Sequence, residues 1–187
     1  MYHILFFGDS LTAGYGLNDP AKESFPALIQ QKITKAGIPF EVINAGLSGD
    51  TSAGGLIRLD YWLSRPIHVF VLELGINDIM RGFSPAATNR NLEAIILKVK
   101  AKYPYSKLAL MGMELPDFIP GLMPAALRTG YRKLADTHHI SFVPFFLEGV
   151  AGIPHLNLND GIHPSAKGYQ IIADKVWPVL KPLLVVD

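Results

Sequence analysis

A serine near the start of the chain and an aspartate and histidine near its end could form a nucleophile with its base. Ser10 lies in the segment Gly-Asp-Ser-Leu-Thr at positions 8–12, and Asp160 precedes His163 by three residues. In nucleophilic catalysis by serine, an imidazole accepts the hydroxyl proton and a carboxylate holds the imidazole in the required tautomer. These three residue types therefore predict acyl transfer through a covalent intermediate on Ser10.

Each of these residues also has a simpler structural explanation. A serine in a turn is more often the N-cap of the helix that follows it, and the His-Pro pair at 163–164 can mark the start of a helix. Neither explanation accounts for an aspartate three residues before the histidine. We therefore expect Ser10 to be the nucleophile, His163 the base, and Asp160 the group that orients it.

Four polar clusters each follow a predicted strand, and the expected active site depends on this placement. Ligands bind at the carboxyl ends of the strands in open parallel sheets, so clusters that are distant in sequence should meet at one edge. Ser10 belongs to the first cluster, and Asp160 and His163 belong to the last. The clusters lie at 8–12, 48–50, 75–78 and 157–164.

Strands and helices alternate along the chain. Short apolar runs predict the strands, and apolar residues spaced by three and four predict the helices. This alternation predicts an α/β protein with a three-layer α/β/α sandwich, a five-stranded parallel sheet and a flavodoxin-like arrangement. A length of 187 residues is best explained by a single domain spanning 1–187. We expect strands at 3–7, 40–44, 69–74, 107–111 and 141–143, a loop at 13–23, and helices at 25–36, 56–63, 91–103, 124–138 and 165–183.

The four clusters, in this order, resemble the conserved blocks of the GDSL or SGNH hydrolases. The resemblance covers nearly the whole chain and is strongest to the bacterial thioesterase I, lysophospholipase L1 and arylesterase group. It rests on Gly-Asp-Ser-Leu at 8–11, Ser-Gly-Asp at 48–50, Gly-Ile-Asn-Asp at 75–78 and Asp-Gly-Ile-His-Pro at 160–164. One departure from α/β-hydrolases supports this family, because Thr12 stands where the Gly-x-Ser-x-Gly elbow requires glycine. A more open, less strained nucleophile turn is expected.

The resemblance implies further roles. The strand order would be 2-1-3-4-5, and the oxyanion hole would consist of the backbone N–H groups of Ser10 and Gly49 with the side-chain amide of Asn77. The substrates would be small-molecule carboxylic esters and thioesters with short to medium acyl chains, with lysophospholipids as a further candidate. The reaction would need no cofactor. Family members are often exported in bacteria, so a mature periplasmic or secreted form is an expectation of the resemblance.

Several acids and histidines invite a metal-binding interpretation. Asp9, Asp50 and Asp78 each adjoin a proposed catalytic residue, and we expect them to brace loops by hydrogen bonds, with metal binding as the lesser alternative. His138 and His139 are sequence neighbours at a predicted helix end, where adjacent side chains point apart. A surface role is therefore favoured for them, and no metal site is expected.

The segment 112–123 is too apolar for a solvated loop and too rich in proline and glycine for a regular element. It follows the fourth predicted strand, so it could line an acyl-binding groove at the same sheet edge. Core packing over the end of the sheet explains the same composition equally well. With Tyr15 as a further lining residue, the candidate substrate-binding residues are Met80, Phe83, Met113, Leu115, Phe118 and Ile119.

Composition restricts the partners. Seventeen basic and sixteen acidic residues give a net charge of +1 without a basic block, so a nucleic-acid partner is not indicated. The absence of cysteine removes disulfides and thiolate nucleophiles. No apolar run reaches the roughly 20 residues that span a bilayer, so stable membrane insertion is not expected. A strand begins directly after Met1, and no signal peptide is recognised. The oligomeric state is not predicted.

Two other functions compete with ester hydrolysis. Related enzymes of the same fold deacetylate carbohydrates, although only two tryptophans and an apolar loop offer little for sugar binding. A non-catalytic α/β module could instead use the same sheet edge to bind a phosphate. That second alternative gives no reason for the spacing of Asp160 and His163.

Overall fold

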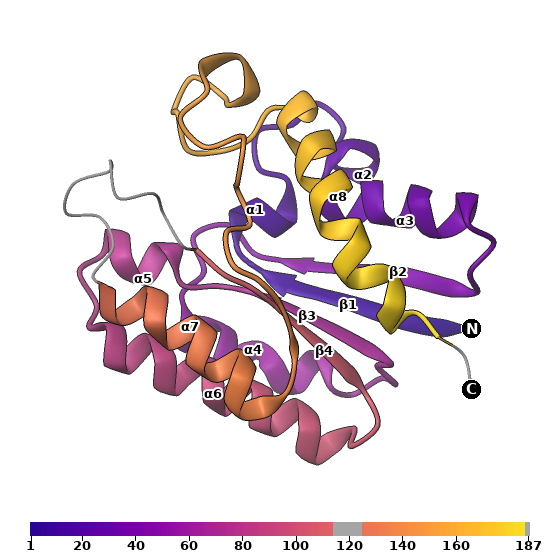
Figure 1. The fold of residues 1–187 in the computed structure, drawn as a ribbon, viewed down its shortest axis with the longest axis vertical. Coiled ribbons are helices and arrows are strands. Elements are labelled where there is room, and N and C mark those ends of the chain that lie inside the picture. The colour runs from indigo at the N-terminus through magenta and orange to yellow at the C-terminus, as the bar shows by residue number, and fades with distance from the viewer. Residues whose placement is uncertain (114–124, 186–187) are drawn as a thin grey trace.

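A five-stranded parallel sheet forms the centre of the protein (Figure 1). The computed structural model describes residues 1–113 and 125–185. The strand order is β2-β1-β3-β4-β5, which confirms the predicted topology and the α/β class. The strands are β1 (Tyr2–Gly8), β2 (Phe40–Gly46), β3 (Val69–Glu73), β4 (Lys107–Met111) and β5 (Ser141–Val143).

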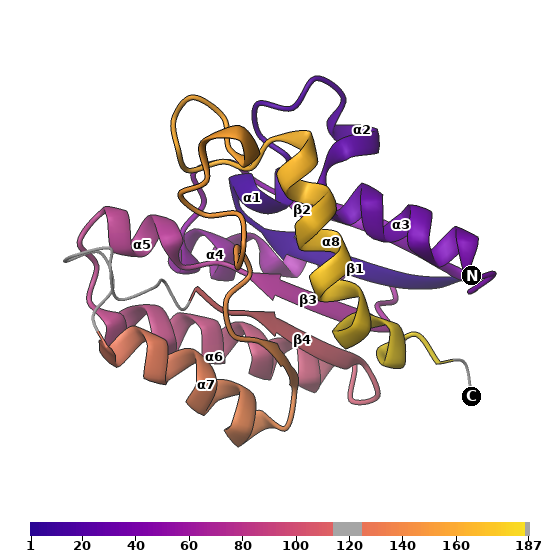
Figure 2. The same ribbon diagram turned by 45° about the horizontal axis from the view of Figure 1, so that its top comes forward.

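Helices cover both faces of the sheet and complete three layers, as Figures 1 and 2 show. Helices α3 and α8 pack together on one face, and α4, α6 and α7 pack on the other. The N-terminus lies at the opposite end of the strands from α1. The helices are α1 (Ser10–Ala13), α2 (Pro20–Glu23), α3 (Phe25–Lys35), α4 (Ser52–Trp62), α5 (Ile76–Met80), α6 (Pro85–Lys102), α7 (Ala125–His138) and α8 (Ala166–Leu180), with 3₁₀ turns at Pro154–Leu156 and Lys181–Leu183.

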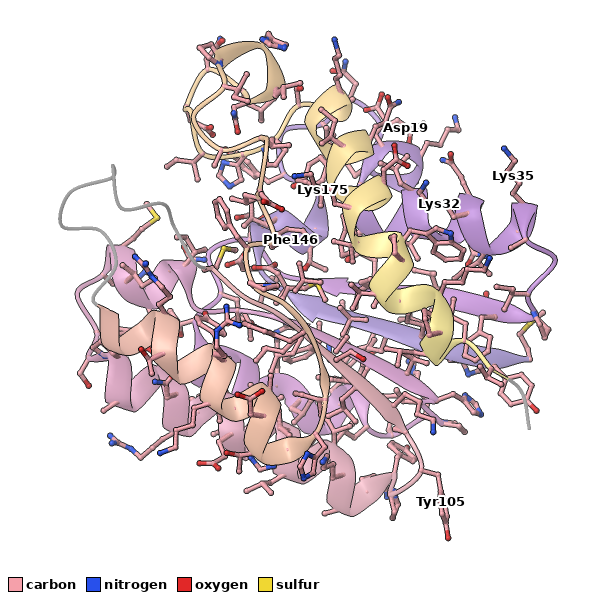
Figure 3. All side chains as sticks on the ribbon, in the orientation of Figure 1. Asp19, Lys32, Lys35, Tyr105, Phe146 and Lys175 are labelled. Carbon is pink, nitrogen blue, oxygen red and sulfur yellow. The ribbon has the colours of Figure 1, made fainter. Side chains whose placement is uncertain are left out.

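Strand β1 is an interior strand of the sheet, because it pairs with β2 on one side and β3 on the other. Its successive side chains face opposite layers. Phe6 packs edge to face on Phe25 of α3, which in turn contacts Phe146 between the sheet and α8 (Figure 3). Phe7 lies against Phe70 on β3. These aromatic contacts fix the strand that carries Ser10 at its end.

Several helix boundaries differ from the sequence prediction because capping residues, which periodicity ignores, decide where a helix begins. Helix α4 starts at Ser52 rather than 56, since the Thr51 side chain accepts a hydrogen bond from the N–H of Gly54. Helix α6 starts at Pro85 rather than 91, and Ser84 caps it in the same way. The predicted loop at 13–23 includes the end of α1 and all of α2, and α5 was not predicted.

The closing helix is shorter than the range 165–183 that the sequence predicts. Helix α8 ends at Leu180, before Pro182, but it continues through Pro178. Proline removes the N–H that would bond to the carbonyl four residues earlier. That carbonyl belongs to Asp174, which lies on the exposed face, so water can replace the lost donor.

Helix α1 approaches β2 closely at Gly46. A Cβ placed on Gly46 would lie 2.2 Å from the backbone nitrogen of Ala13 and 2.6 Å from its Cα. Glycine is therefore required where the nucleophile helix crosses the neighbouring strand.

We predict that Gly46→Ala lowers the free energy of unfolding by about 3 kcal/mol, because backbone atoms cannot move aside as side chains can. It should also displace α1 and with it Ser10. Chemical denaturation measures the loss of stability. Gly37→Ala is the matched control, since Gly37 has an open surrounding but a φ of 67°. Its cost should be only about 1 kcal/mol, and equal losses in the two variants would contradict the steric explanation.

Candidate active site

The serine corner is a short helix whose cap is Asp9, not Ser10. One oxygen of Asp9, Oδ1, accepts the N–H of Leu11 at 2.9 Å. Ser10 is thus the first residue of α1, and its hydroxyl is not used for capping. No described residue of the corner other than glycine has a positive φ, which agrees with the expectation of an unstrained turn.

Ser10, His163 and Asp160 form a chain of hydrogen bonds. The Ser10 Oγ lies 2.8 Å from Nε2 of His163, although 153 positions separate the two residues. The other ring nitrogen, Nδ1, lies 2.7 Å from Oδ2 of Asp160. The structure therefore brings together all three residues that the sequence predicted, in the geometry that lets imidazole accept a serine proton.

Asp160 is held as a carboxylate. Although partial burial opposes it, hydrogen bonds from the backbone N–H groups of His163 and Ile162 and from the His163 ring lower the pKa of Asp160 to about 2. Its Oδ1 accepts the two backbone N–H groups at 3.0 and 2.9 Å. A permanent negative charge beside Nδ1 stabilises the imidazolium that forms when His163 takes a proton.

The loop that carries His163 is closed on itself and tied to the nucleophile helix. Leu158 donates its N–H to the His163 carbonyl at 2.7 Å. At the start of α8, the buried Tyr169 hydroxyl donates to the carbonyl of Leu11 at 2.8 Å. The Tyr15 ring lies 4.8 Å from the His163 ring. These contacts position the imidazole from both sides.

Two backbone donors face the same cavity as Ser10. Gly49 has a φ of 78°, a conformation that residues with a side chain rarely adopt. Its carbonyl accepts a hydrogen bond from the Arg81 guanidinium at 2.8 Å. Within residues 1–113 and 125–185, neither the Ser10 N–H nor the Gly49 N–H donates to another group. Both donors are therefore available to an oxyanion.

The third predicted donor, Asn77, is fully engaged in the resting structure. Its Nδ2 donates to Oδ2 of Asp9 at 3.0 Å and to the carbonyl of Asp50 at 2.9 Å. An amide nitrogen has two hydrogens. Asn77 can therefore donate to an oxyanion only if it shares or gives up one of these bonds.

The acids beside the catalytic residues brace loops, as predicted. Asp50 accepts from Arg58 Nε at 2.6 Å, and Asp78 accepts the N–H of Ser52 at 2.8 Å, which fixes the start of α4. In the part of the chain that the structure describes, no group of three or more histidine or acidic side chains could hold a metal ion.

Arg58 was not singled out from the sequence, where it reads as a surface position of a helix. In addition to Asp50, its guanidinium donates to the carbonyls of Ala45 at 2.8 Å and Gly8 at 2.9 Å. It thus joins the carboxyl ends of β1 and β2 beneath the cavity. No sequence signal identifies these backbone partners.

Glu73 was also missed, because the run at 69–74 was read only as an apolar strand. It is fully buried and accepts the Thr12 hydroxyl at 2.8 Å and the Asp9 N–H at 3.3 Å. Burial, and then the charge of Asp9, raise the pKa of Glu73 well above its ordinary range. Burial also raises the pKa of Asp9 to about 7. One acid inside an apolar strand is a signal that could have identified it.

A cavity of about 280 Å³ opens over Ser10, His163 and Asn77. Among the described residues that line it, Asp160 and His163 carry the ionisable side chains other than the Tyr15 phenol, and apolar residues supply much of the remaining wall. A larger cavity, of about 560 Å³, lies by Tyr2, His68 and Tyr105, away from the catalytic residues. The smaller cavity is lined by Ser10, Leu11, Tyr15, Ser48, Gly49, Ile76, Asn77, Met80, Asp160, Ile162 and His163.

The predicted substrate-binding residues fare differently. Met80 lines the cavity, whereas Phe83 is half exposed and is not among the lining residues. Met113 is fully buried in the core, forms a β-bridge with Phe145 beyond the end of β4 and is not among the lining residues, so its role in substrate binding stays a prediction. The remaining three candidates, Leu115, Phe118 and Ile119, lie outside the described residues.

The two neighbouring histidines separate as expected. Nε2 of His138 lies 3.1 Å from Oε1 of Glu93, and the His138 side chain is less exposed than the predicted surface position implies. His139 is exposed and has a φ of 49° at the end of α7.

No helix in the described parts of the chain has the length and apolar character needed to cross a bilayer.

Comparison with known proteins places this geometry in a family. The chain is 40% identical to the esterase TesA of Pseudomonas aeruginosa over 184 residues, which cover 97% of this chain and 89% of that protein. It is 38% identical to thioesterase 1/protease 1/lysophospholipase L1 of Escherichia coli K12, with coverage of 97% and 84%.

The fold also matches solved structures. The crystal structure of the esterase EstA from Pseudoalteromonas sp., inhibited by monoethylphosphonate, superposes with a TM-score of 0.86 at 31% identity and covers 98% of this chain and 99% of that one. The model of the GDSL-like lipase/acylhydrolase family matches residues 6–171. The chain belongs to the GDSL-like lipase/acylhydrolase family.

Proposed function

We propose that the protein hydrolyses carboxylic esters and thioesters through an acyl-enzyme on Ser10. The observation that carries this proposal is the hydrogen-bonded chain from Ser10 through His163 to Asp160, which opens into a cavity with unused backbone donors. The relatives named above include an esterase and a thioesterase. We also infer that residues 1–187 act as one catalytic domain, which the extent of the family match supports.

The reaction follows from this geometry. The Ser10 oxygen attacks the acyl carbonyl carbon while Nε2 of His163 takes the hydroxyl proton. The carbonyl oxygen becomes an anion that the N–H groups of Ser10 and Gly49 and the amide of Asn77 stabilise. The intermediate collapses, the alcohol or thiol leaves with the proton from His163, and the acyl group stays on Ser10. A water molecule, deprotonated by the same imidazole, then releases the acid.

The cavity favours an uncharged acyl group of modest length. Met80, Ile76 and Ile162 contribute apolar walls, and no lysine or arginine is among the described residues that line the site, so an anionic tail would find no such partner there. A volume of about 280 Å³ at an open surface fits a short to medium acyl chain. An exported, mature form of the protein is a further proposal that rests on the family resemblance alone, and cell fractionation would test it.

Replacing the nucleophile gives the most direct test. We predict that Ser10→Ala lowers turnover of p-nitrophenyl esters by at least about 10³-fold, because the acyl-enzyme can no longer form. The circular dichroism spectrum should be unchanged. A fluorophosphonate should label the wild type at Ser10 and leave the variant unlabelled. Wild-type rates in the variant would refute the assignment, and an unlabelled wild type would favour a binding module.

Replacing Asp160 by Asn should keep acceptors for the backbone N–H groups but remove the charge beside His163. We predict a loss in turnover of roughly 10²-fold to 10⁴-fold. Asp60→Asn, a matched change in an exposed acid paired with Lys98, should leave turnover unchanged.

The same variant tests the pKa of Asp160. Since the pKa is depressed from 3.8 to about 2 in the folded protein, Asp160 stabilises the fold above pH 4, and this contribution is lost as the pH falls toward 2. The urea midpoint of the wild type should therefore fall more steeply in this range than that of Asp160→Asn. Parallel curves would contradict the assigned pKa.

The acyl-binding wall can be tested with chain length. We predict that Met80→Ala lowers kcat/KM for p-nitrophenyl octanoate by about fivefold relative to acetate, because apolar contact with the longer chain is lost. Leu97→Ala is the control, since Leu97 is similarly exposed on α6 but does not line the cavity. A loss that is equal for both esters would remove Met80 from the acyl site. Activity confined to an acetylated xylan oligomer would instead identify a carbohydrate deacetylase.

A further inference from the structure

Two buried carboxyl groups lie directly behind the predicted oxyanion hole, and the reaction described above does not use them. Asp9 and Glu73 are 0% and 1% exposed. The Asp9 N–H donates to Oε2 of Glu73, which also accepts the Thr12 hydroxyl, whereas Oδ2 of Asp9 accepts a hydrogen from Asn77. The pair is therefore in hydrogen-bond contact with both the nucleophile turn and the third oxyanion donor.

The surroundings of Glu73 indicate that it carries a proton. Its second oxygen, Oε1, is buried and accepts no hydrogen bond from any described residue. A hydrogen bond between the two carboxyl groups raises the pKa of Glu73 and lowers that of Asp9, apart from the larger effect of burial on both. This is the pattern of a neutral Glu73 that donates to an ionised Asp9. Two adjacent buried carboxylates would otherwise repel each other without compensation.

In the part of the chain that the structure describes, no cation forms an ion pair with Asp9 or Glu73 that could replace this proton. The acids Asp50 and Asp78 face the same region, and Asp50 raises the pKa of Asp9. The guanidinium of Arg58 is bonded to Asp50 and to two backbone carbonyls. The hydroxyls of Tyr131 and Tyr169 donate to the carbonyls of Leu74 and Leu11. Neutralisation of one carboxyl by a proton is the remaining route.

The two acceptors of Asn77 are unequal. A hydrogen bond to an ionised acceptor is roughly twice as strong as one to a neutral acceptor. The bond from Nδ2 to the Asp9 carboxylate is thus the stronger one, and the bond to the Asp50 carbonyl is the weaker one. When a negative oxygen forms on the substrate, the hydrogen on the Asp50 carbonyl is the one that can be transferred to it, while the bond to Asp9 keeps the amide in place.

We propose that Asp9 and Glu73 form a one-proton carboxyl pair in which neutral Glu73 keeps Asp9 ionised, and ionised Asp9 positions Asn77 for the oxyanion. Both are positioning residues, because neither touches the reacting atoms. The inference deepens the proposed function and rests on the role given there to Asn77. A second proton on the pair removes the charge on Asp9 and weakens the hold on Asn77.

The variant Asp9→Asn tests the charge. Asparagine is as good an N-cap as aspartate, so α1 should be kept. With its oxygen on the Leu11 N–H, its NH₂ group faces the NH₂ group of Asn77 and turns it away. We expect kcat to fall by about tenfold to 100-fold, bounded by the cost of losing a whole oxyanion donor, with KM nearly unchanged and the melting temperature within a few degrees of wild type.

The pH dependence separates this role from simple packing. The pKa of Asp9 is raised to about 7, so the wild type should lose its advantage as the pH falls through that value. The ratio of wild-type to Asp9→Asn kcat should be largest at pH 8 to 9 and approach one at pH 5 to 6. Because Ser10, His163 and Asp160 are the same in both proteins, any effect of pH on their chemistry cancels in the ratio. A ratio independent of pH would overturn the proposal.

Two substitutions of Glu73 test the proton. Gln can accept from Thr12 and the Asp9 N–H and donate to the Asp9 carboxylate, so Glu73→Gln should retain the greater part of the wild-type kcat. Glu73→Leu supplies no donor and should lose about as much as Asp9→Asn. Difference infrared spectroscopy at pH 7 should show the carbonyl stretch of a protonated carboxyl in the wild type, and this band should be absent in Glu73→Gln. Glu148→Gln, at an exposed acid paired with Lys175, controls for the loss of any glutamate.

The outcomes distinguish a failure of the proposed hydrolase function from a failure of the Asp9–Glu73 carboxyl pair alone. If Ser10→Ala keeps its activity, the proposed function fails. If Ser10→Ala is inactive but Glu73→Gln is as impaired as Glu73→Leu, or the infrared band is missing from the wild type, Glu73 is not a neutral donor and only the carboxyl pair is overturned. If Glu73→Leu does not fold, Asp9→Asn and Glu73→Gln still decide the question.

Discussion

The active site depends on one hydrogen bond that the chain can form only when its sheet is complete. Ser10 meets His163 because β1 is an interior strand and its carboxyl end faces the loop that follows β5. Parallel strands place every such loop at the same edge. The nucleophile, the oxyanion loop and the base come from different strands, so their relative positions are set by strand register and by the helices packed on either face.

Hydrogen bonds between polar groups beneath the cavity connect these loops and restrict their relative orientation. Arg58 bonds to the ends of β1 and β2 and to Asp50, and Asp50 accepts from Asn77 through its carbonyl. Hydrogen bonds are directional, so this network fixes angles as well as distances. The cavity rim is different in character, because Tyr15, Met80 and Ile162 are exposed and have few such constraints. Rigid reaction geometry therefore lies below an adaptable substrate surface.

Sequence reasoning succeeded where a single local pattern decides the structure. Apolar runs located all five strands, and the motifs located Ser10, Asp160 and His163 at one edge. It failed where the start of a helix or the role of a residue depends on contacts that the sequence pattern does not reveal. Helix α4 begins earlier than periodicity suggests because Thr51 caps it. Glu73 and Arg58 acquire their roles only through Thr12, Asp9 and backbone carbonyls that folding brings to them.

The bond from Tyr169 to the carbonyl of Leu11 links the last long helix to the first turn after β1. A ribosome makes the Tyr169 segment only after it has added more than 150 further residues to the Ser10 segment, since 158 positions separate Leu11 from Tyr169. Until then the early turn lacks this partner, and the serine lacks its imidazole. A nascent chain therefore carries an inert serine until the segment with His163 and Tyr169 has been synthesised and has folded against the first strand.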